Sequence, residues 1–171
     1  MRNTMLALLV LYGLQVAAQD MSSCPMHKEH QRQTDVEEHG DEAMGFPHDR
    51  TTHHFRLTAD GGNIEVVVND PKDTPNLAAV RSHLAHIKSM FSDGNCSIPM
   101  FVHGEVPPGV TEMKERTSEI SYSFEELKTG GRVWITTKNR DAVNTIHDFL
   151  RFQIAEHQTG DAMGITSPER Y

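Results

Sequence analysis

Residues 51–68, Thr-Thr-His-His-Phe-Arg-Leu-Thr-Ala-Asp-Gly-Gly-Asn-Ile-Glu-Val-Val-Val, decide the fold of this chain. Side chains alternate between apolar and polar over 53–58 and again over 64–68, which is the period-two pattern of half-buried strands. The pair Gly61-Gly62 lies between the two runs and is typical of a tight turn. The stretch therefore predicts an antiparallel hairpin.

A helix is expected next, because Asp73 or Thr74 can cap a helix that has Pro75 in its first turn. Apolar residues then recur every three or four positions, and Gly94 ends the pattern. The apolar side of this helix consists of Leu77, Val80, Leu84, Ile87 and Phe91.

The second half of the chain repeats this plan. Side chains alternate over 120–124, Gly130-Gly131 follows, and Val133 and Ile135 line a second strand before a helix that opens at Asn139 or Asp141. We therefore predict an α+β fold over 51–160, a ββαββα pseudo-repeat with a four-stranded antiparallel sheet and two helices on one face. A chance similarity of two ββα units is the alternative, and it leaves the fold class unchanged.

The connection over 95–117 carries three prolines and reads as a long loop with one short strand at 100–103. Loops of this length inside a compact domain are usually functional or disordered.

The ends of the chain differ from the domain. Residues 1–18 have a basic start, an apolar run and small residues before a cleavage point after Ala18, so they predict a signal peptide and an exported protein, periplasmic or secreted. Residues 19–50 are polar and charged and predict a mobile histidine-containing arm, with a short helix over 34–38. Residues 161–171 are expected to form a tail.

Charge and histidine content narrow the functional classes. The formal net charge is −8, which argues against general nucleic-acid binding and against stable attachment to an anionic membrane. Eleven of the 171 residues are histidine, well above an average composition. Histidine is the commonest metal-ligating side chain, so this excess favours a metal site.

The helix over 74–92 carries the clearest ligand set. His83, His86 and Met90 share a direction at 100° per residue, and the following segment adds Met100 and His103. Imidazole with thioether favours copper first and zinc second. The alternative is that the two helix histidines are surface residues and Met90 fills the core.

Four further histidines form two pairs, one on the first strand and one on the last helix. His53 and His54 point to opposite faces of the first strand, and His53, in phase with Phe55, faces the helices and can join the site; an ordinary strand-edge pair is the alternative. On the last helix, His147 and His157 are expected to pack or cap. A protonated His157 would also suit the helix dipole.

A secondary, weaker metal site is predicted at the start of the arm, where soft ligands stand close together in the sequence. Its residues are Cys24, Met26, His27 and His30. The segment Cys24-Pro25-Met26-His27 resembles the Cys-Pro-Met-His core of heavy-metal-binding segments in bacterial copper-transport proteins, although Lys28 stands where that family continues with proline. A disulfide between Cys24 and Cys96 is the alternative for this thiol.

Over residues 44–161 the chain resembles a family of small exported bacterial proteins of unsettled function. The resemblance lies in Met44-Gly45-Phe46, 51–55, the Gly61-Gly62 hairpin, 100–103 and 148–153. Some members are labelled aspartate carbamoyltransferase. This chain lacks the Ser-Thr-Arg-Thr phosphate motif and the length of those transferases, so that activity is not expected here.

The sequence thus favours an exported protein that buffers, delivers or senses a soft or borderline metal. The alternatives are a haem protein, a metalloenzyme in which Glu105 or Glu112 supplies an acid or base, and a structural or interaction domain with incidental histidines. No Gly-x-Ser-x-Gly, P-loop or His-Glu-x-x-His motif is present. A homodimer could form through a sheet face that carries Val67 and Trp134.

Overall fold

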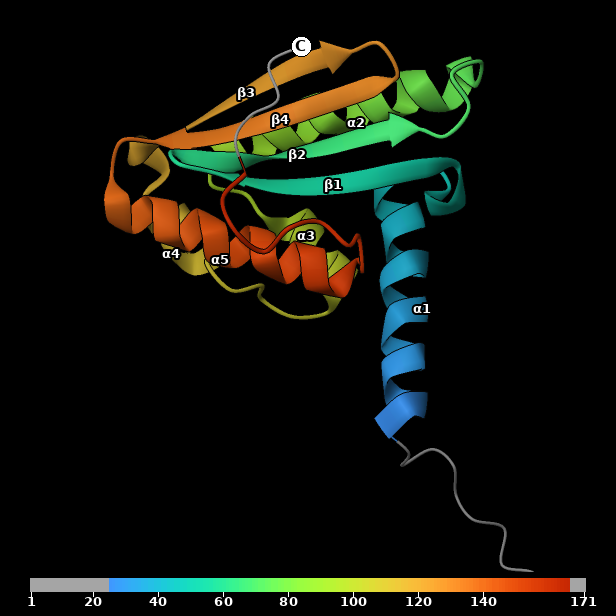
Figure 1. Ribbon diagram of the computed structural model, residues 1–171, viewed down its shortest axis with the longest axis horizontal. Helices are drawn as coiled ribbons and strands as arrows, with labels where there is room; N and C mark the ends of the chain where they lie inside the picture. Colours follow the sequence, from blue (N-terminus) through green and yellow to red (C-terminus); the bar gives the residue numbers. More distant parts are fainter. Residues whose placement is uncertain (1–24, 167–171) are drawn as a thin grey trace, which may run out of the picture.

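The computed structural model describes residues 25–166 and has the predicted α+β architecture, with four antiparallel strands in the order β1-β2-β4-β3 (Figure 1). The strands are β1 (Thr51–Thr58), β2 (Gly61–Val68), β3 (Ile120–Leu127) and β4 (Gly130–Thr137). The helix α2 (Thr74–Ser92) follows the first hairpin and α5 (Arg140–Glu156) follows the second. Both helices begin as the sequence predicts, because Asp73 accepts from the Asn76 amide and Asn139 accepts from the Asp141 amide.

Each hairpin turns before its glycine pair, so the prediction that these glycines form the turns is wrong. Thr58 pairs with Gly61 and Leu127 pairs with Gly130, which leaves Ala59-Asp60 and Lys128-Thr129 as the two-residue turns. The glycines are the first residues of β2 and β4.

The glycines are needed in the two central strands because β2 and β4 approach each other there. A Cβ atom on Gly61 would lie 2.1 Å from the Ile135 carbonyl oxygen, and one on Gly130 would lie 1.9 Å from the Val66 carbonyl oxygen. Both distances are far inside van der Waals contact, so a side chain at either position would push the strands apart.

A leucine from a helix packs against the second glycine of each pair, and the same arrangement occurs in both halves of the chain. A Cβ on Gly62 would lie 2.3 Å from Cδ1 of Leu150 on α5, and one on Gly131 would lie 3.1 Å from Cδ1 of Leu84 on α2. Each helix therefore packs closest to the hairpin of the other half. This exchange is the structural form of the predicted pseudo-repeat.

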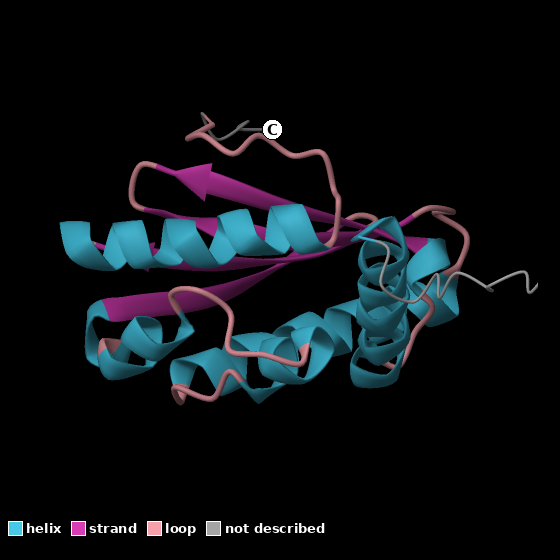
Figure 2. Cartoon of the chain, turned by 90° about the horizontal axis from the view of Figure 1, so that it is seen from below, coloured by secondary structure: helices cyan, strands magenta, loops and turns pink. Residues whose placement is uncertain are grey.

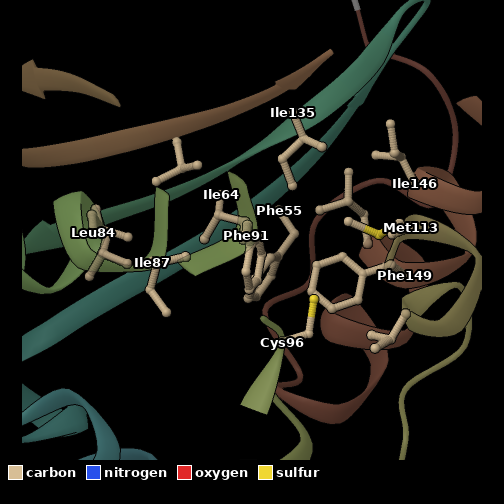
Figure 3. Packing of buried hydrophobic residues seen from close by; sticks show 14 of the residues in the cluster. Phe55, Ile64, Leu84, Ile87, Phe91, Cys96, Met113, Ile135, Ile146 and Phe149 are labelled. Atoms are coloured by element: carbon tan, nitrogen blue, oxygen red, sulfur yellow. The ribbon is translucent and has the colours of Figure 1, made fainter. Parts of the chain in front are cut away.

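The core lies between the sheet and the two long helices. Figure 3 shows Phe55 and Ile64 from the sheet meeting Leu84, Ile87 and Phe91 of α2, with Phe149 of α5 beside them. Phe91 and Phe149 make an edge contact with ring centroids 6.0 Å apart. Such burial of apolar surface is the main favourable contribution to folding.

The segment over 95–117 contains helices, and the predicted strand at 100–103 is wrong. The helix α3 (Ser97–His103) ends at Gly104 with φ +64°, and α4 (Val110–Glu115) and the short 3₁₀ turn η3 (Thr117–Glu119) follow. The run Met100-Phe101-Val102 has strand-like composition. In the helix only Val102 of the three is buried, so helical periodicity fits its environment.

Residues 25–44 form one continuous helix, α1 (Pro25–Met44), which is far longer than the expected helix over 34–38. Figure 1 shows α1 extending away from the sheet. It packs beside α3 and is joined to β1 by Phe46, which is buried in the core, and by the 3₁₀ turn η2 (His48–Arg50). Val36 is buried on its inner side. Among residues 25–166, no helix is both long and apolar enough to cross a membrane.

After α5 the chain returns along β1, as Figures 1 and 2 show. Ile165 forms a parallel bridge with Leu57, and the Thr166 amide donates to the Leu57 carbonyl at 2.9 Å. Asp161 holds the start of this returning segment against β1, because its carboxylate accepts a hydrogen bond from the Phe55 amide at 3.0 Å. Part of the expected tail is thus fixed to the domain.

Candidate functional site

A cavity of about 70 Å³ lies between the sheet and the helices α1, α2, α3 and α5. Four of the eleven histidines line it, and each comes from a different part of the fold: His53, His83, His103 and His157. The remaining walls are almost entirely apolar, with the Met44 thioether and the Gln153 amide as further heteroatoms. Of residues 25–166, none contributes a carboxylate or a hydroxyl group to the lining.

The strand β1 and the end of α5 bring two of these rings together. The rings of His53 and His157 are stacked, with centroids 5.9 Å apart and planes 7° apart. The ring of His157 also stands edge-on to that of His103, with centroids 5.1 Å apart. Three imidazoles from distant parts of the sequence are therefore in mutual contact.

Burial keeps these rings neutral. Desolvation, followed by the nearby His83, lowers the pKa of His53 to about 4. Desolvation, followed by His86, lowers the pKa of His83 to about 4. Desolvation, followed by His53 and His103, lowers the pKa of His157 to about 3. A neutral His157 adds no favourable charge to the helix dipole, and it occupies the C-cap position of α5, as the expected packing or capping role allows.

His103 is the most buried of the four, and its side chain has no exposed area. Its Nε2 lies 3.1 Å from Oε1 of Gln153. An amide oxygen only accepts hydrogen bonds, so Nε2 carries the proton and Nδ1 keeps a free lone pair. This Nδ1 has no hydrogen-bond partner among the described residues. Desolvation lowers the pKa of His103, against the opposing effects of Gln153 and Glu156.

Gln153 and Glu156 connect this ring to the surface. The amide nitrogen of Gln153 is buried and also has no hydrogen-bond partner in the described part of the chain; leaving such a donor unpaired costs about 1–3 kcal/mol. The Glu156 carboxylate lies 3.9 Å from Nδ1 of His103 and accepts from Nε of Arg32 on α1 at 2.7 Å. Arg32 also bonds Glu105, beyond α3.

The structure brings together three of the six residues predicted for the main metal site. His53, His83 and His103 line the cavity. His86 is exposed on α2. Met90 is partly buried and Met100 is 40% exposed, and neither belongs to the lining. The helical spacing named a helix that lines the cavity, but it also included residues of that helix that lie outside the lining.

Of the secondary set, Met26 is 78% exposed and His30 is exposed on α1. His27 also belongs to α1, while Cys24 lies outside the described residues. Its predicted disulfide partner Cys96 is buried in the core, where desolvation raises the pKa of the thiol to about 11. A thiol with so high a pKa is a poor nucleophile at neutral pH.

Sequence reasoning did not assign Met44, Gln153 or His157 to the cavity. The signal for two of them is present at the end of α5. Gln153 lies seven residues after Ile146, and His157 lies seven residues after Leu150. Residues seven positions apart lie on one helix face, so the apolar stripe of α5 continues through the glutamine to the histidine.

Two other histidines have structural roles. His147 is buried and its Nε2 lies 2.9 Å and 3.0 Å from the Thr58 and Gly61 carbonyls, across the first turn. His54 points to the outer face of the sheet, where Nδ1 lies 3.0 Å from Asp161. The expected packing role of His147 and the opposite orientations of His53 and His54 both agree with the structure.

Charged side chains form a network of hydrogen bonds on the outer face of the sheet. Glu65 accepts from Arg56 at 2.9 Å and from Arg132. Arg132 lies over the ring of Trp134, 5.1 Å from its centroid, and the indole nitrogen donates to Glu125 at 2.8 Å. Trp134 and Val67 are partly buried, so this face is less apolar than the sequence suggested.

The chemical capacity of the site comes from its neutral imidazoles. Within residues 25–166, no three His, Cys, Asp or Glu side chains are already arranged to hold a metal ion. His53, His83, His103 and His157 nevertheless line one cavity, and burial lowers the pKa of each ring, so neutral imidazole nitrogens are the groups there that could bind an ion. No protein-family model, no curated protein and no solved structure matches this chain.

Proposed function

We propose that the protein is an exported metal-binding protein whose site is the histidine-lined cavity, with copper as the first choice of ion and zinc as the second. The observation that carries this proposal is the convergence of His53, His83, His103 and His157 on one cavity. Because burial lowers the pKa of all four, their lone pairs are free at neutral pH.

The ligand chemistry supports a soft or borderline ion. Imidazole suits copper and zinc, whereas magnesium and calcium need oxygen ligands, and the cavity lining has no carboxylate or hydroxyl. The Met44 thioether, which also lines the cavity, favours Cu(I) over Zn²⁺. Copper therefore remains the first choice.

The size of the cavity favours an ion over haem. The cavity volume of about 70 Å³ is well below the roughly 300–1,000 Å³ of pockets that hold organic ligands and cofactors. It therefore suits an ion better than a macrocycle.

Residues 1–18 have the composition of a signal peptide, so we place the protein outside the cytoplasm. Their removal would leave all eleven histidines in the mature chain. Buffering, delivery or sensing of the ion are the roles that we assign to this site.

Isothermal titration of the mature protein with Cu(I), with a competing chelator, and with Zn²⁺ tests the proposal. We expect one ion per chain at the cavity and a loss of at least tenfold in affinity for His83→Ala. His86→Ala is the matched control, because His86 lies one turn away on the exposed side of α2, and it should keep the wild-type affinity.

Equal affinity in wild type and His83→Ala would refute the cavity as the site. If His86→Ala loses affinity and His83→Ala does not, the ion binds the surface of α2. An absence of binding to the wild-type protein refutes the proposed function as a whole.

A further inference from the structure

The buried amide of Gln153 marks a second binding position in the cavity. Gln153 is 4% exposed, and its Oε1 is occupied by His103. Its Nε2 has two hydrogen atoms and no acceptor among the described residues. Since buried donors are nearly always paired, this amide is placed to donate to something that enters the cavity.

The positive charge of a bound metal ion also requires a negatively charged partner in the cavity. Four neutral imidazoles and a thioether would leave the full charge of an ion uncompensated among apolar walls, because no carboxylate lines the cavity. A buried charge is strongly unfavourable unless it is paired. The Glu156 carboxylate, 3.9 Å from Nδ1 of His103, is outside the lining and already pairs with Arg32.

We propose that the cavity binds a small anion of one to three heavy atoms together with a divalent ion, as a ligand of the metal that accepts a hydrogen bond from Nε2 of Gln153. This inference rests on the proposed metal function and adds the chemical class of a second ligand. The anion neutralises part of the buried charge and satisfies the unpaired amide. The cavity volume of about 70 Å³ is several times the roughly 10–15 Å³ that one bound water molecule requires, so the cavity has space for more than one small group.

Gln153 also acts as a positioning residue for His103. The bond from Nε2 of His103 to Oε1 fixes the tautomer with a free Nδ1. Any variant at this position must therefore separate the acceptor that orients His103 from the donor that contacts the anion. Gln153→Glu keeps the acceptor oxygen and removes the donor, whereas Gln153→Leu removes both.

Azide is a suitable probe, because its binding to Cu(II) produces a charge-transfer absorption band. The mature protein is first titrated with Cu(II) alone and then, once loaded, with azide. We expect one azide per ion in the wild type. Gln153→Glu should weaken azide binding at least tenfold while Cu(II) still binds, since it removes the donor and adds repulsion.

Asn144→Asp is the matched control, because it adds one negative charge on the exposed side of the same helix, and its azide affinity should stay within twofold of the wild type. Gln153→Leu should lose azide affinity as well and should also lower Cu(II) affinity through His103. Circular dichroism confirms that each variant is folded.

The two proposals fail differently. An absence of Cu(II) binding in the first titration refutes a cavity site for divalent copper and, with it, the anion, whereas the separate titrations with Cu(I) and Zn²⁺ decide the metal function. Normal Cu(II) binding without azide binding, or equal azide affinity in wild type and Gln153→Glu, refutes the anion position and leaves the metal site intact.

Discussion

The rings of His53 and His157 stack at 5.9 Å, although 104 positions separate them in the sequence. One belongs to β1, and the other caps the C-terminus of α5. The contact therefore joins the first strand of the domain to its last helix beside the cavity. Burial lowers the pKa of both rings, and the pKa of His157 is lowered further by His53, so the stability of this contact depends on pH.

The unfolding free energy of the metal-free protein should fall as the pH drops from 7 to 4. In the unfolded chain a histidine has its ordinary pKa of about 6.5, whereas in the folded protein the pKa values of His53 and His83 are about 4 and that of His157 about 3. The unfolded state therefore binds more protons below pH 6.5, and stability rises with pH across this window.

Since one pKa unit is worth about 1.36 kcal/mol, the upper bound is about 3 kcal/mol each for His53 and His83 and about 5 kcal/mol for His157. Denaturant unfolding at pH 7.5, 6, 5 and 4 measures the slope. His157→Phe keeps an aromatic ring beside His53 and removes one titrating group, so its slope should be smaller. An unchanged slope in this variant would show that His157 does not contribute.

Much of the fold could be predicted because local signals and tertiary packing agree. The alternation over 51–68 and the caps at Asp73 and Asn139 are local, and the structure confirms them. The helix α1 could not be predicted in full, since it is polar along most of its length. It is stabilised by pairs such as Gln31 with Asp35 and by burial of Val36 against the domain.

The candidate site was only half predictable for a related reason. Helical spacing placed His83 with His86 and Met90, but the structure turns only His83 toward the cavity. Which neighbour on a helix faces inward depends on the exact rotation of the helix against the sheet. The contribution of α1, through Met44, depends on how α1 docks, which no local pattern specifies.

Gly62→Ala should destabilise the protein strongly. The added Cβ would lie 2.3 Å from the Arg56 carbonyl oxygen and 2.3 Å from Cδ1 of Leu150. The carbonyl is part of β1 and cannot rotate away, so we expect a loss of about 2–3 kcal/mol or more. Gly164→Ala is the control, because its Cβ meets no atom within 4 Å. Chemical denaturation of both variants measures the difference, and similar midpoints would contradict the close packing of the strands.

Asp161→Ala should release the returning segment from β1. The Asp161 carboxylate accepts from Thr159 at 2.7 Å, from the Phe55 amide at 3.0 Å and from His54 at 3.0 Å. Loss of these charged hydrogen bonds should lower the unfolding free energy by about 1–3 kcal/mol. Amide exchange of Phe55 and Thr166 should become faster.

Asp148→Ala is the control for this variant, because the Asp148 carboxylate is exposed and pairs only with the neighbouring Arg151. It should leave the exchange of Phe55 unchanged. Metal affinity should be retained in both variants, since His54 points away from the cavity. A loss of metal binding in Asp161→Ala would instead indicate that the anchor also holds His53 or His157 in place.

Arg32→Met should loosen α1 without unfolding the domain. Arg32 joins α1 to Glu156 of α5 and to Glu105 beyond α3. The Arg32 side chain is 47% exposed, so removal of its charge should change the global unfolding free energy by no more than about 1 kcal/mol. The local effect should be larger, because Val36 is the main buried side chain of the helix. Hydrogen exchange of residues 30–44 should become several-fold faster, while α2 and α5 keep their protection.

Arg50→Met is the matched control, since Arg50 is exposed and lies 4.0 Å from its nearest carboxylate, Asp49. Added salt should reduce the difference between Arg32→Met and wild type by screening the wild-type pairs. Equal exchange of α1 in all three proteins would show that Val36 and Phe46 alone hold this helix over the cavity.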